Sequence, residues 1–185
     1  MALTVDPAAV ESAKIDSAAL ERLIEVVWPE AYRIALAILR DRGLAEDAAQ
    51  DACATIVRSL GALHNAATFA SWTYRIAANA AVTIGRRRRA AESLDRAGAS
   101  CAASIDAAEA VDLDNALAAL PVVQRAAIVL HYYAGLKSSE IAAATGCPSS
   151  TVRFHIMLAK RALRKALAVE RTASTLSDEV VTNAR

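Results

Sequence analysis

The residues whose types and spacing carry the clearest chemistry lie near the C-terminus, in the stretch GLKSSEIAAATGCPSSTVRF at 135–154. Ser138 can cap a short helix, with Glu140 in its first turn near the positive end of the helix dipole. Gly146 can take the left-handed conformation that ends this helix, and Pro148 marks the start of the next one. A short helix, a glycine turn and a longer helix form the shape that places its second helix in a DNA major groove. The spacing therefore indicates DNA as the first partner to consider.

The helix after the turn is predicted to have two unlike faces. Its apolar residues recur every three or four positions, as one helical face requires: Val152, Ile156, Ala159, Leu163 and Leu167. Its basic residues cluster elsewhere: Lys160, Arg161, Arg164 and Lys165. A basic side can be no more than the solvated face of an amphipathic helix, but the turn in front of it favours contact with phosphate. A further helix from Pro121 to Tyr133 would complete a small domain.

Covalent chemistry has no comparable signature in this sequence. There is no glycine-rich phosphate loop, no His-Glu-x-x-His or Gly-x-Ser-x-Gly, and no motif that pairs a nucleophile with a base. The three cysteines, Cys53, Cys101 and Cys147, are widely spaced, so neither a disulfide framework nor a zinc site is indicated, and Cys53 is interpreted as a small core residue. The histidines show no ligand spacing. We therefore expect no enzymatic activity, no cofactor and no metal.

The formal net charge of +1 hides a strong local asymmetry. An acidic stretch contains Asp41, Glu46, Asp47 and Asp51. A basic stretch follows, with Arg75, Arg86, Arg87, Arg88, Arg89 and Arg96. Such a basic cluster attracts phosphate largely independently of base sequence, and less strongly as the salt concentration rises. The basic stretch is therefore a second candidate for contact with nucleic acid.

The chain has 185 residues, abundant alanine, few aromatics, and little glycine or proline, so it is predicted to be all-α. We expect two small helical domains joined by a flexible linker, the C-terminal one a helix-turn-helix domain. The predicted boundaries are a loose N-terminal tail at 1–16, a first domain at 17–91, a linker at 92–110, a second domain at 111–170 and a mobile tail at 171–185. No run of about 18 apolar residues could span a membrane and no secretion signal is recognisable, so a cytoplasmic protein without membrane insertion is expected.

Periodicity predicts several helices in the first domain. The first begins near Ser17, and Pro29 can start or kink the segment that follows it. Asp41–Gly43 is expected to end that segment. The next two helices are predicted over 45–60 and from 68 to about 88.

Three segments in this order resemble the extracytoplasmic-function group of the sigma-70 family, which are bacterial transcription initiation factors. AEDAAQD at 45–51 is similar to that family's polymerase-binding helix, and FASWTYRIAAN at 69–79 is similar to its promoter-melting helix. LPVVQR at 120–125, followed by YYAGLKSSEIA at 132–142, is similar to its second DNA-binding domain. The resemblance covers roughly residues 17–169.

The resemblance implies a dissociable specificity subunit that binds core RNA polymerase, recognises two promoter elements, melts the downstream one and leaves after initiation. The residues expected to dock on the coiled coil of the polymerase's largest subunit are Glu46, Asp47, Gln50 and Asp51. A carboxylate-rich helical face suits this contact because it can pair with arginines of a facing helix. Acidic residues can also merely stabilise a solvated helix start, but that does not explain Gln50 and Asp51 deeper in the helix.

The resemblance also implies a site that recognises and melts the downstream promoter element. Its expected residues are His64, Asn65, Trp72, Tyr74, Arg75, Asn79, Arg86, Arg87 and Arg88. Melting needs a pocket for an unstacked base, stacking surfaces and cations along the backbone. Trp72 is also interpretable as a core residue. The arginine run is also interpretable as a solvated helix end, although four consecutive arginines favour phosphate contact.

The second domain is expected to read the upstream promoter element, with base contacts from its recognition helix and phosphate contacts from the flanks. The expected residues are Ser149, Ser150, Thr151, Arg153, Phe154, Met157, Leu158, Lys160, Arg161 and Arg164. Phe154, Met157 and Leu158 lie away from the apolar stripe, where relatives commonly carry basic and small polar residues. We hypothesise that these three either contact thymine methyl groups or are covered by another surface before DNA binds.

Other departures from the family lie in the first domain, where Cys53 and Val57 stand in place of bulky aromatics. Thr83 and Gly85 stand in place of acidic and apolar residues. The family likeness further implies control by an anti-sigma protein that wedges between or wraps around the two domains and releases the chain under stress. The main alternative is a stand-alone helix-turn-helix regulator that binds duplex DNA without docking on polymerase.

Overall fold

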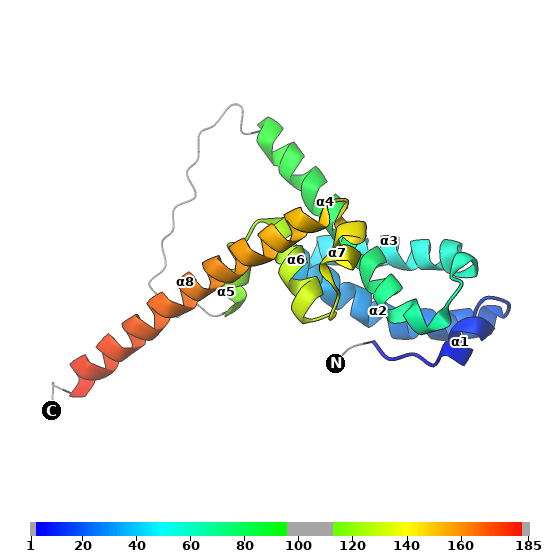
Figure 1. Ribbon diagram of the computed structural model, residues 1–185, viewed down its shortest axis with the longest axis horizontal. Helices are drawn as coiled ribbons and strands as arrows, with labels where there is room; N and C mark the ends of the chain where they lie inside the picture. Colours follow the sequence, from blue (N-terminus) through cyan, green and yellow to red (C-terminus); the bar gives the residue numbers. More distant parts are fainter. Residues whose placement is uncertain (1–2, 96–112, 183–185) are drawn as a thin grey trace.

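The computed structural model describes residues 3–95 and 113–182, and all regular secondary structure in these two ranges is helical (Figure 1). The prediction of an all-α fold is confirmed. Four α-helices precede the gap between the described ranges and four follow it. None of the described helices is both long enough and apolar enough to cross a membrane.

The N-terminal segment is ordered by a short helix, α1 (Pro7–Ser12). The expectation of a loose tail is therefore wrong for residues 3–16. Leu3 and Val10 are both buried, and the Leu3 amide donates a hydrogen bond to the Tyr74 hydroxyl. Burial of these apolar side chains ties the segment to the helices that follow.

The second helix, α2 (Ser17–Leu39), is continuous and contains Pro29 in its interior. Pro29 therefore does not begin a separate helix. The Asp16 carboxylate caps the N-terminal end of α2. At the other end Arg40 adopts a left-handed conformation, with φ of 59°, which turns the chain sharply out of the helix.

The third helix, α3 (Arg42–Ser59), starts two residues after Arg40. The Asp41 carboxylate accepts a hydrogen bond from the Leu44 amide at 3.0 Å and so caps this helix. The expectation that residues 41–43 would end a helix is therefore wrong. Arg40 makes the turn, and residues 42 and 43 already belong to α3.

The fourth helix, α4 (Phe69–Asp95), follows two short 3-10 turns, η1 (Leu60–Ala62) and η2 (Ala66–Thr68). It contacts both α2 and α3, and the three helices form the first helical unit. The helix extends past residue 88 into the predicted linker, because residues 86–95 include no glycine or proline to stop it. The remainder of that linker, 96–110, lies outside the described residues.

The second helical unit contains four helices. They are α5 (Leu113–Ala118), α6 (Val122–Tyr132), α7 (Ser138–Thr145) and α8 (Ser149–Thr182). α6 contacts both α7 and α8, and α5 contacts α8. The core of the second helical unit includes four buried residues: Leu130, Ile141, Val152 and Ala159. The expected apolar stripe of the recognition helix thus packs inward over its first turns.

The turn between α7 and α8 agrees with its prediction except at the helix cap. Gly146 is left-handed, with φ of 67°, and Pro148 directly precedes α8. The Lys137 amide donates a hydrogen bond to the Glu140 carboxylate at 2.8 Å. The side chain of Glu140, rather than that of Ser138, therefore satisfies a free amide at the start of α7.

The last helix is longer than expected. α8 projects from the rest of the molecule and continues to Thr182, whereas a mobile tail was expected from residue 171 (Figure 1). From residue 149 to 182 the sequence has no glycine or proline, so no helix-breaking residue interrupts it. Residues 183–185 lie outside the described range.

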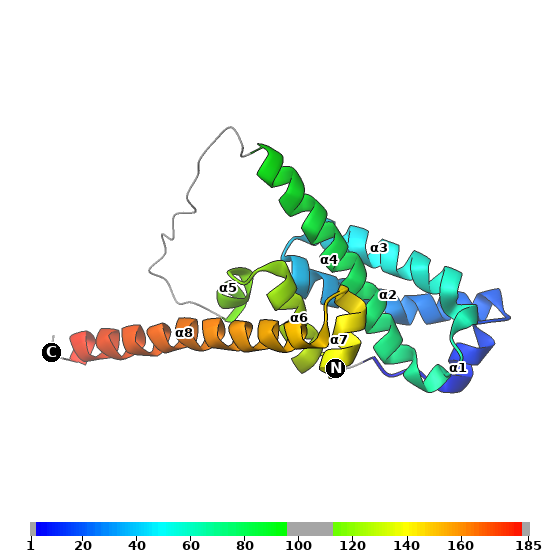
Figure 2. The same ribbon diagram turned by 45° about the horizontal axis from the view of Figure 1, so that its top comes forward.

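The two helical units lie against each other in both views (Figures 1 and 2): α6 contacts α2 and α4, and α7 contacts α4. A Cβ atom placed on Gly85 of α4 would lie 2.9 Å from Val122 Cγ1 of α6, so the two helices meet closely there. Nearby, the Tyr133 hydroxyl donates to the Glu30 carboxylate at 3.2 Å and accepts from Arg33 at 3.0 Å. A glycine and a short polar network thus join the units.

Candidate nucleic-acid interface

Four polar side chains form one outward side of α3. Glu46, Asp47, Gln50 and Asp51 are all exposed, and we call this set the docking face. The buried side of the same helix consists of Ala45, Ala48, Ala49 and Ala52. Because these alanines hold the helix against its unit, the acidic side chains point to solvent, where a basic partner can reach them.

A cavity of about 380 Å³ adjoins the docking face. Its lining includes Asp51 of α3, Arg75 and Asn79 of α4, and Ala143 and Ala144 of α7. The structure therefore brings one predicted docking residue together with two predicted melting residues. Because α7 supplies part of the wall, the second helical unit covers part of this surface.

Four side chains of α4 in this cavity form a surface that we call the melting face: Trp72, Arg75, Asn79 and Arg87. Trp72 is half-buried, and its ring centroid lies 5.9 Å from that of Phe69. The Arg75 Nε is buried without a hydrogen-bond partner among the described residues, while Asn79 is exposed. An aromatic surface, an unused N–H donor and an amide are groups that could hold an unstacked base.

Tyr74 does not belong to this face. It is 3% exposed, and its hydroxyl accepts the hydrogen bond from the Leu3 amide. Burial raises the pKa of the Tyr74 phenol. The prediction that Tyr74 contacts DNA is therefore wrong for this structure: on α4 it lies on the core side, where it holds the N-terminal segment.

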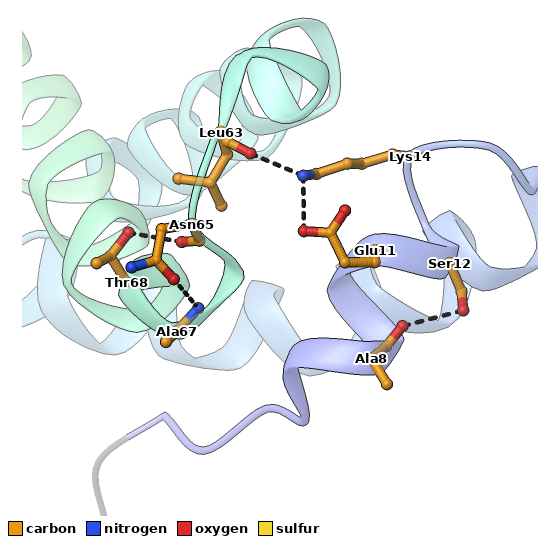
Figure 3. A network of polar contacts seen from close by, with 8 residues as sticks. All are labelled: Ala8, Glu11, Ser12, Lys14, Leu63, Asn65, Ala67 and Thr68. Carbon is orange, nitrogen blue, oxygen red and sulfur yellow. Dashed lines mark hydrogen bonds and ion pairs between the residues drawn. The ribbon is translucent and has the colours of Figure 1, made fainter.

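His64 and Asn65 lie in the exposed loop between the two 3-10 turns. The Asn65 side-chain oxygen accepts a hydrogen bond from the Ala67 amide at 3.0 Å, so it caps η2 (Figure 3). Lys14 reaches the same loop and donates to the Leu63 carbonyl at 2.7 Å. The loop is thus held in shape from both sides, with the His64 ring left exposed.

The arginine run at the end of α4 points in several directions. Arg86 donates to the Thr145 carbonyl of α7 at 3.4 Å, while Arg87 lines the cavity beside α3. Arg88 forms an ion pair with Asp41 at 2.8 Å. The Leu44 amide and the Arg88 guanidinium both hold the pKa of the Asp41 carboxyl below its usual value.

The predicted upstream-element residues of α8 divide into exposed and half-buried groups. The exposed ones are Ser150, Arg153, Phe154, Met157, Arg161 and Arg164. The half-buried ones are Ser149, Thr151, Leu158 and Lys160. Phe154 and Met157 are each 53% exposed, so about half of each residue remains open to solvent. The Lys160 ammonium lies 5.7 Å from the centroid of the Tyr132 ring, a cation–π contact.

An apolar groove between α5, α6 and α8 was not anticipated from the sequence. It has a volume of about 590 Å³, and its lining includes Leu117, Tyr132, Leu163 and Leu167 together with Arg164. The available signal was the length of the apolar stripe, because Leu163 and Leu167 continue it beyond the compact part of the domain.

Cys53 is buried, as predicted for a core residue, and burial raises the pKa of its thiol. Cys101 lies outside the described residues. Within the described part of the chain, no group of three or more His, Cys, Asp or Glu side chains could hold a metal ion.

Two family models match the chain: Sigma-70 region 2 over residues 23–91, and Sigma-70 region 4 over residues 110–163. RNA polymerase sigma-H factor of Pseudomonas aeruginosa is 30% identical over 169 residues, which cover 82% of this chain and 88% of that protein. ECF RNA polymerase sigma factor SigE of Mycolicibacterium smegmatis is 33% identical over 173 residues, which cover 86% of this chain and 67% of that protein.

The fold is also similar to that of solved sigma factors. Sigma factor RpoE from Bartonella quintana, crystallised with the anti-sigma factor NepR, has a TM-score of 0.61 at 24% identity, over 82% of this chain and 98% of that one. CnrH, in complex with the cytosolic domain of CnrY, has a TM-score of 0.60 at 21% identity, over 89% of this chain and 98% of that one. With both sigma regions matched in order, the chain belongs to the extracytoplasmic-function group of the sigma-70 family of RNA polymerase sigma factors.

Proposed function

We propose that this protein is an alternative sigma factor that binds core RNA polymerase and directs initiation at promoters with two recognised elements. The observation that carries the proposal is the presence of three surfaces on one chain: the docking face, the melting face and the helix-turn-helix. A sigma factor needs all three, whereas a duplex-binding regulator needs only the last.

The docking face would bind the coiled coil of the polymerase's largest subunit. Its support is local: Glu46, Asp47, Gln50 and Asp51 are exposed together on a helix whose other side is locked in the core. Carboxylates arrayed along an exposed helix can pair with arginines of a facing helix at charge-assisted hydrogen-bond distance. Charges of this kind also speed the encounter between the two partners.

The melting face would capture a base of the separated downstream element. The half-buried Trp72 ring offers a stacking surface, and Arg75 and Asn79 offer hydrogen-bonding groups beside it. Arg87 lies near enough to line the same cavity and would contact the backbone. His64 and Asn65 would approach the same strand from the preceding loop.

The recognition helix, α8, would read the upstream element. Arg153, Phe154, Met157 and Arg161 are exposed on its described surface. Arginines can donate to guanine or to phosphate, and the two apolar side chains can contact thymine methyl groups. Ser149, Ser150 and Thr151 stand at the start of the helix, where hydroxyls and free amides can bind phosphate.

An anti-sigma partner would control the protein in the cytoplasm, where polymerase acts. RpoE of Bartonella quintana was crystallised with such a partner, and its fold is similar to this one. The apolar groove between α5, α6 and α8 gives a partner helix a surface to cover. The protein itself would catalyse no reaction.

In vitro transcription tests the proposal. Purified protein is added to core RNA polymerase with fragmented host genomic DNA, and transcript starts are sequenced. Discrete starts that share two upstream motifs are expected. Asp47→Ala should lower the yield of every start, while Glu21→Ala, which removes an exposed carboxylate from α2, should leave the yield unchanged.

The rival is a stand-alone regulator. If no transcript starts are found and the protein alone binds duplex DNA tightly, the stand-alone regulator would replace the sigma-factor proposal. Equal starts from wild type and Asp47→Ala would leave the sigma function but remove Asp47 from the contact with polymerase.

A further inference from the structure

A buried arginine lies between the two helical units. Arg125 of α6 is 6% exposed. Its Nη1 donates to the Ala118 carbonyl at 3.3 Å, but its Nε has no hydrogen-bond partner among the described residues. No described carboxylate forms an ion pair with it. A buried charge without a counter-charge is strongly unfavourable. A bound anion would supply the missing counter-charge and stabilise this arrangement.

The surroundings make the arginine more costly still. Burial, together with the nearby charges of Arg40 and Arg89, lowers the pKa of Arg125 to about 10. These neighbours come from different helices, Arg40 at the end of α2 and Arg89 on α4. Three guanidinium groups from separate elements therefore converge on one place.

That place is a cavity of about 310 Å³. Four arginines line it: Arg40, Arg88, Arg89 and Arg125. One carboxylate lines it as well, Asp41, and this group is already engaged by Arg88 at 2.8 Å. At about 30 Å³ for each water in the liquid, the cavity has room for roughly ten waters, enough for a diphosphate group.

We propose that this arginine cavity binds a small phosphorylated anion. Guanidinium groups match phosphate oxygens with paired N–H donors, and several of them around one cavity favour a polyanion over a chloride ion. The DNA backbone carries the same phosphate chemistry. A free solute fits better because Arg125 is buried, whereas a duplex reaches exposed side chains.

An anion bound at this site would inhibit the protein as a sigma factor. This consequence rests on the proposed function. Its walls come from both helical units, so an anion bound there stabilises the packed arrangement over any separated one. In the packed arrangement α7 covers part of the melting face. An occupied cavity would therefore hold that face away from promoter DNA.

Calorimetric titration of the full chain with sodium pyrophosphate tests the site, without polymerase and at constant ionic strength. Wild type is expected to bind with one-to-one stoichiometry. Arg89→Gln, at an exposed position, should weaken binding at least tenfold, and Arg125→Met, which keeps the volume but not the charge, should weaken it further. Arg22→Gln, which removes an exposed arginine of α2 that lines neither cavity, is the matched control and should keep the affinity within about twofold.

Three results would overturn the proposal. The first is absence of pyrophosphate binding to wild type, and the second is equal loss of binding in Arg22→Gln and Arg89→Gln. The third is an Arg89-dependent affinity for a short single-stranded oligonucleotide that exceeds the affinity for pyrophosphate. The last result would make the DNA backbone the occupant. Arg89→Gln keeps the test decisive even where Arg125→Met does not fold. Transcription with core polymerase, run without pyrophosphate, reports separately on the sigma function.

Discussion

The docking face and the melting face belong to the same helical unit, but the second unit covers part of the melting face and leaves most of the docking face exposed. Glu46, Asp47 and Gln50 stand open on α3, while Arg75 and Asn79 line a cavity that α7 partly closes. In this arrangement the proposed polymerase-binding surface is exposed, and the proposed DNA-binding surface is partly covered. Polymerase can therefore bind first, and if it binds the separated units better, its binding shifts the population toward an exposed melting face.

Reversing a charge on the docking face should produce the largest effect. Asp47→Arg places a cation where a basic partner is expected, which costs about 2–5 kcal/mol of binding free energy, or more than tenfold in affinity. Fluorescence anisotropy with core RNA polymerase measures this affinity. The control, Glu21→Arg, introduces the same charge on α2. Equal affinities for the two variants would remove Asp47 from the docking face.

A side chain at Gly85 should separate the two helical units. This substitution tests whether their contact is what covers the melting face. In Gly85→Val the first added carbon already lies 2.9 Å from Val122 Cγ1, so overpacking should cost about 1–3 kcal/mol of contact between the units. Small-angle scattering should show a larger radius of gyration. Binding of the free protein to single-stranded downstream-element DNA should rise about fivefold to tenfold, as the loss of roughly 1 kcal/mol implies.

Gly61→Val is the matched control, because a Cβ atom at Gly61 meets nothing within 4 Å. Its radius of gyration and DNA affinity should equal those of wild type. An unchanged radius in Gly85→Val would mean that the contact between α4 and α6 does not hold the units together.

A smaller effect is expected from the polar network at Tyr133. Tyr133→Phe removes hydrogen bonds to Glu30 and Arg33, which should lower the free energy of unfolding by about 0.5–1.5 kcal/mol in chemical denaturation. Tyr132→Phe is the control, because its exposed hydroxyl has no such bonds. If both variants lower the free energy of unfolding equally, the hydrogen bonds of Tyr133 to Glu30 and Arg33 do not stabilise the protein.

The smallest expected effect is a pH dependence at Asp41. Its pKa is lowered in the folded protein, so its contribution is present above the unfolded value of about 3.9 and is lost as pH falls through the folded value. The melting temperature of wild type should thus fall more steeply below about pH 4 than that of Asp41→Asn. Parallel melting curves across this range would show that the Asp41 charge, held by the Leu44 amide and by Arg88, does not stabilise the fold.

Helical periodicity and cap residues were enough to predict most of the fold. Gly146 ends α7 as expected because a turn there requires a left-handed residue, and the alanines of α3 mark its buried side. Two kinds of detail were not predicted. Some depend on contacts between residues distant in sequence, and others on which of two nearby side chains makes a given hydrogen bond. Ser138 and Glu140 can both satisfy the start of α7, and only the structure shows that Glu140 does.

The same distinction applies to the candidate site. The acidic residues of α3 were predicted, and they are exposed together as a docking face requires. Tyr74 was misplaced because the side of α4 that it occupies is covered by the N-terminal segment, 71 residues away in sequence at Leu3. The arginine cavity was missed because Arg40, Arg89 and Arg125 come from separate helices. Gly85, noted only as a departure from the family, proves to be where α4 and α6 meet.

The most direct test of the difference between the two faces is a pair of binding measurements with one single-stranded oligonucleotide that carries the downstream promoter element. We predict weak binding to the free protein, and binding at least tenfold tighter to its complex with core polymerase, with the increase lost in Arg75→Ala. If the free wild-type protein binds the oligonucleotide as tightly as the complex does, the melting face is not covered in solution, and the account of an open docking face and a closed DNA face is wrong.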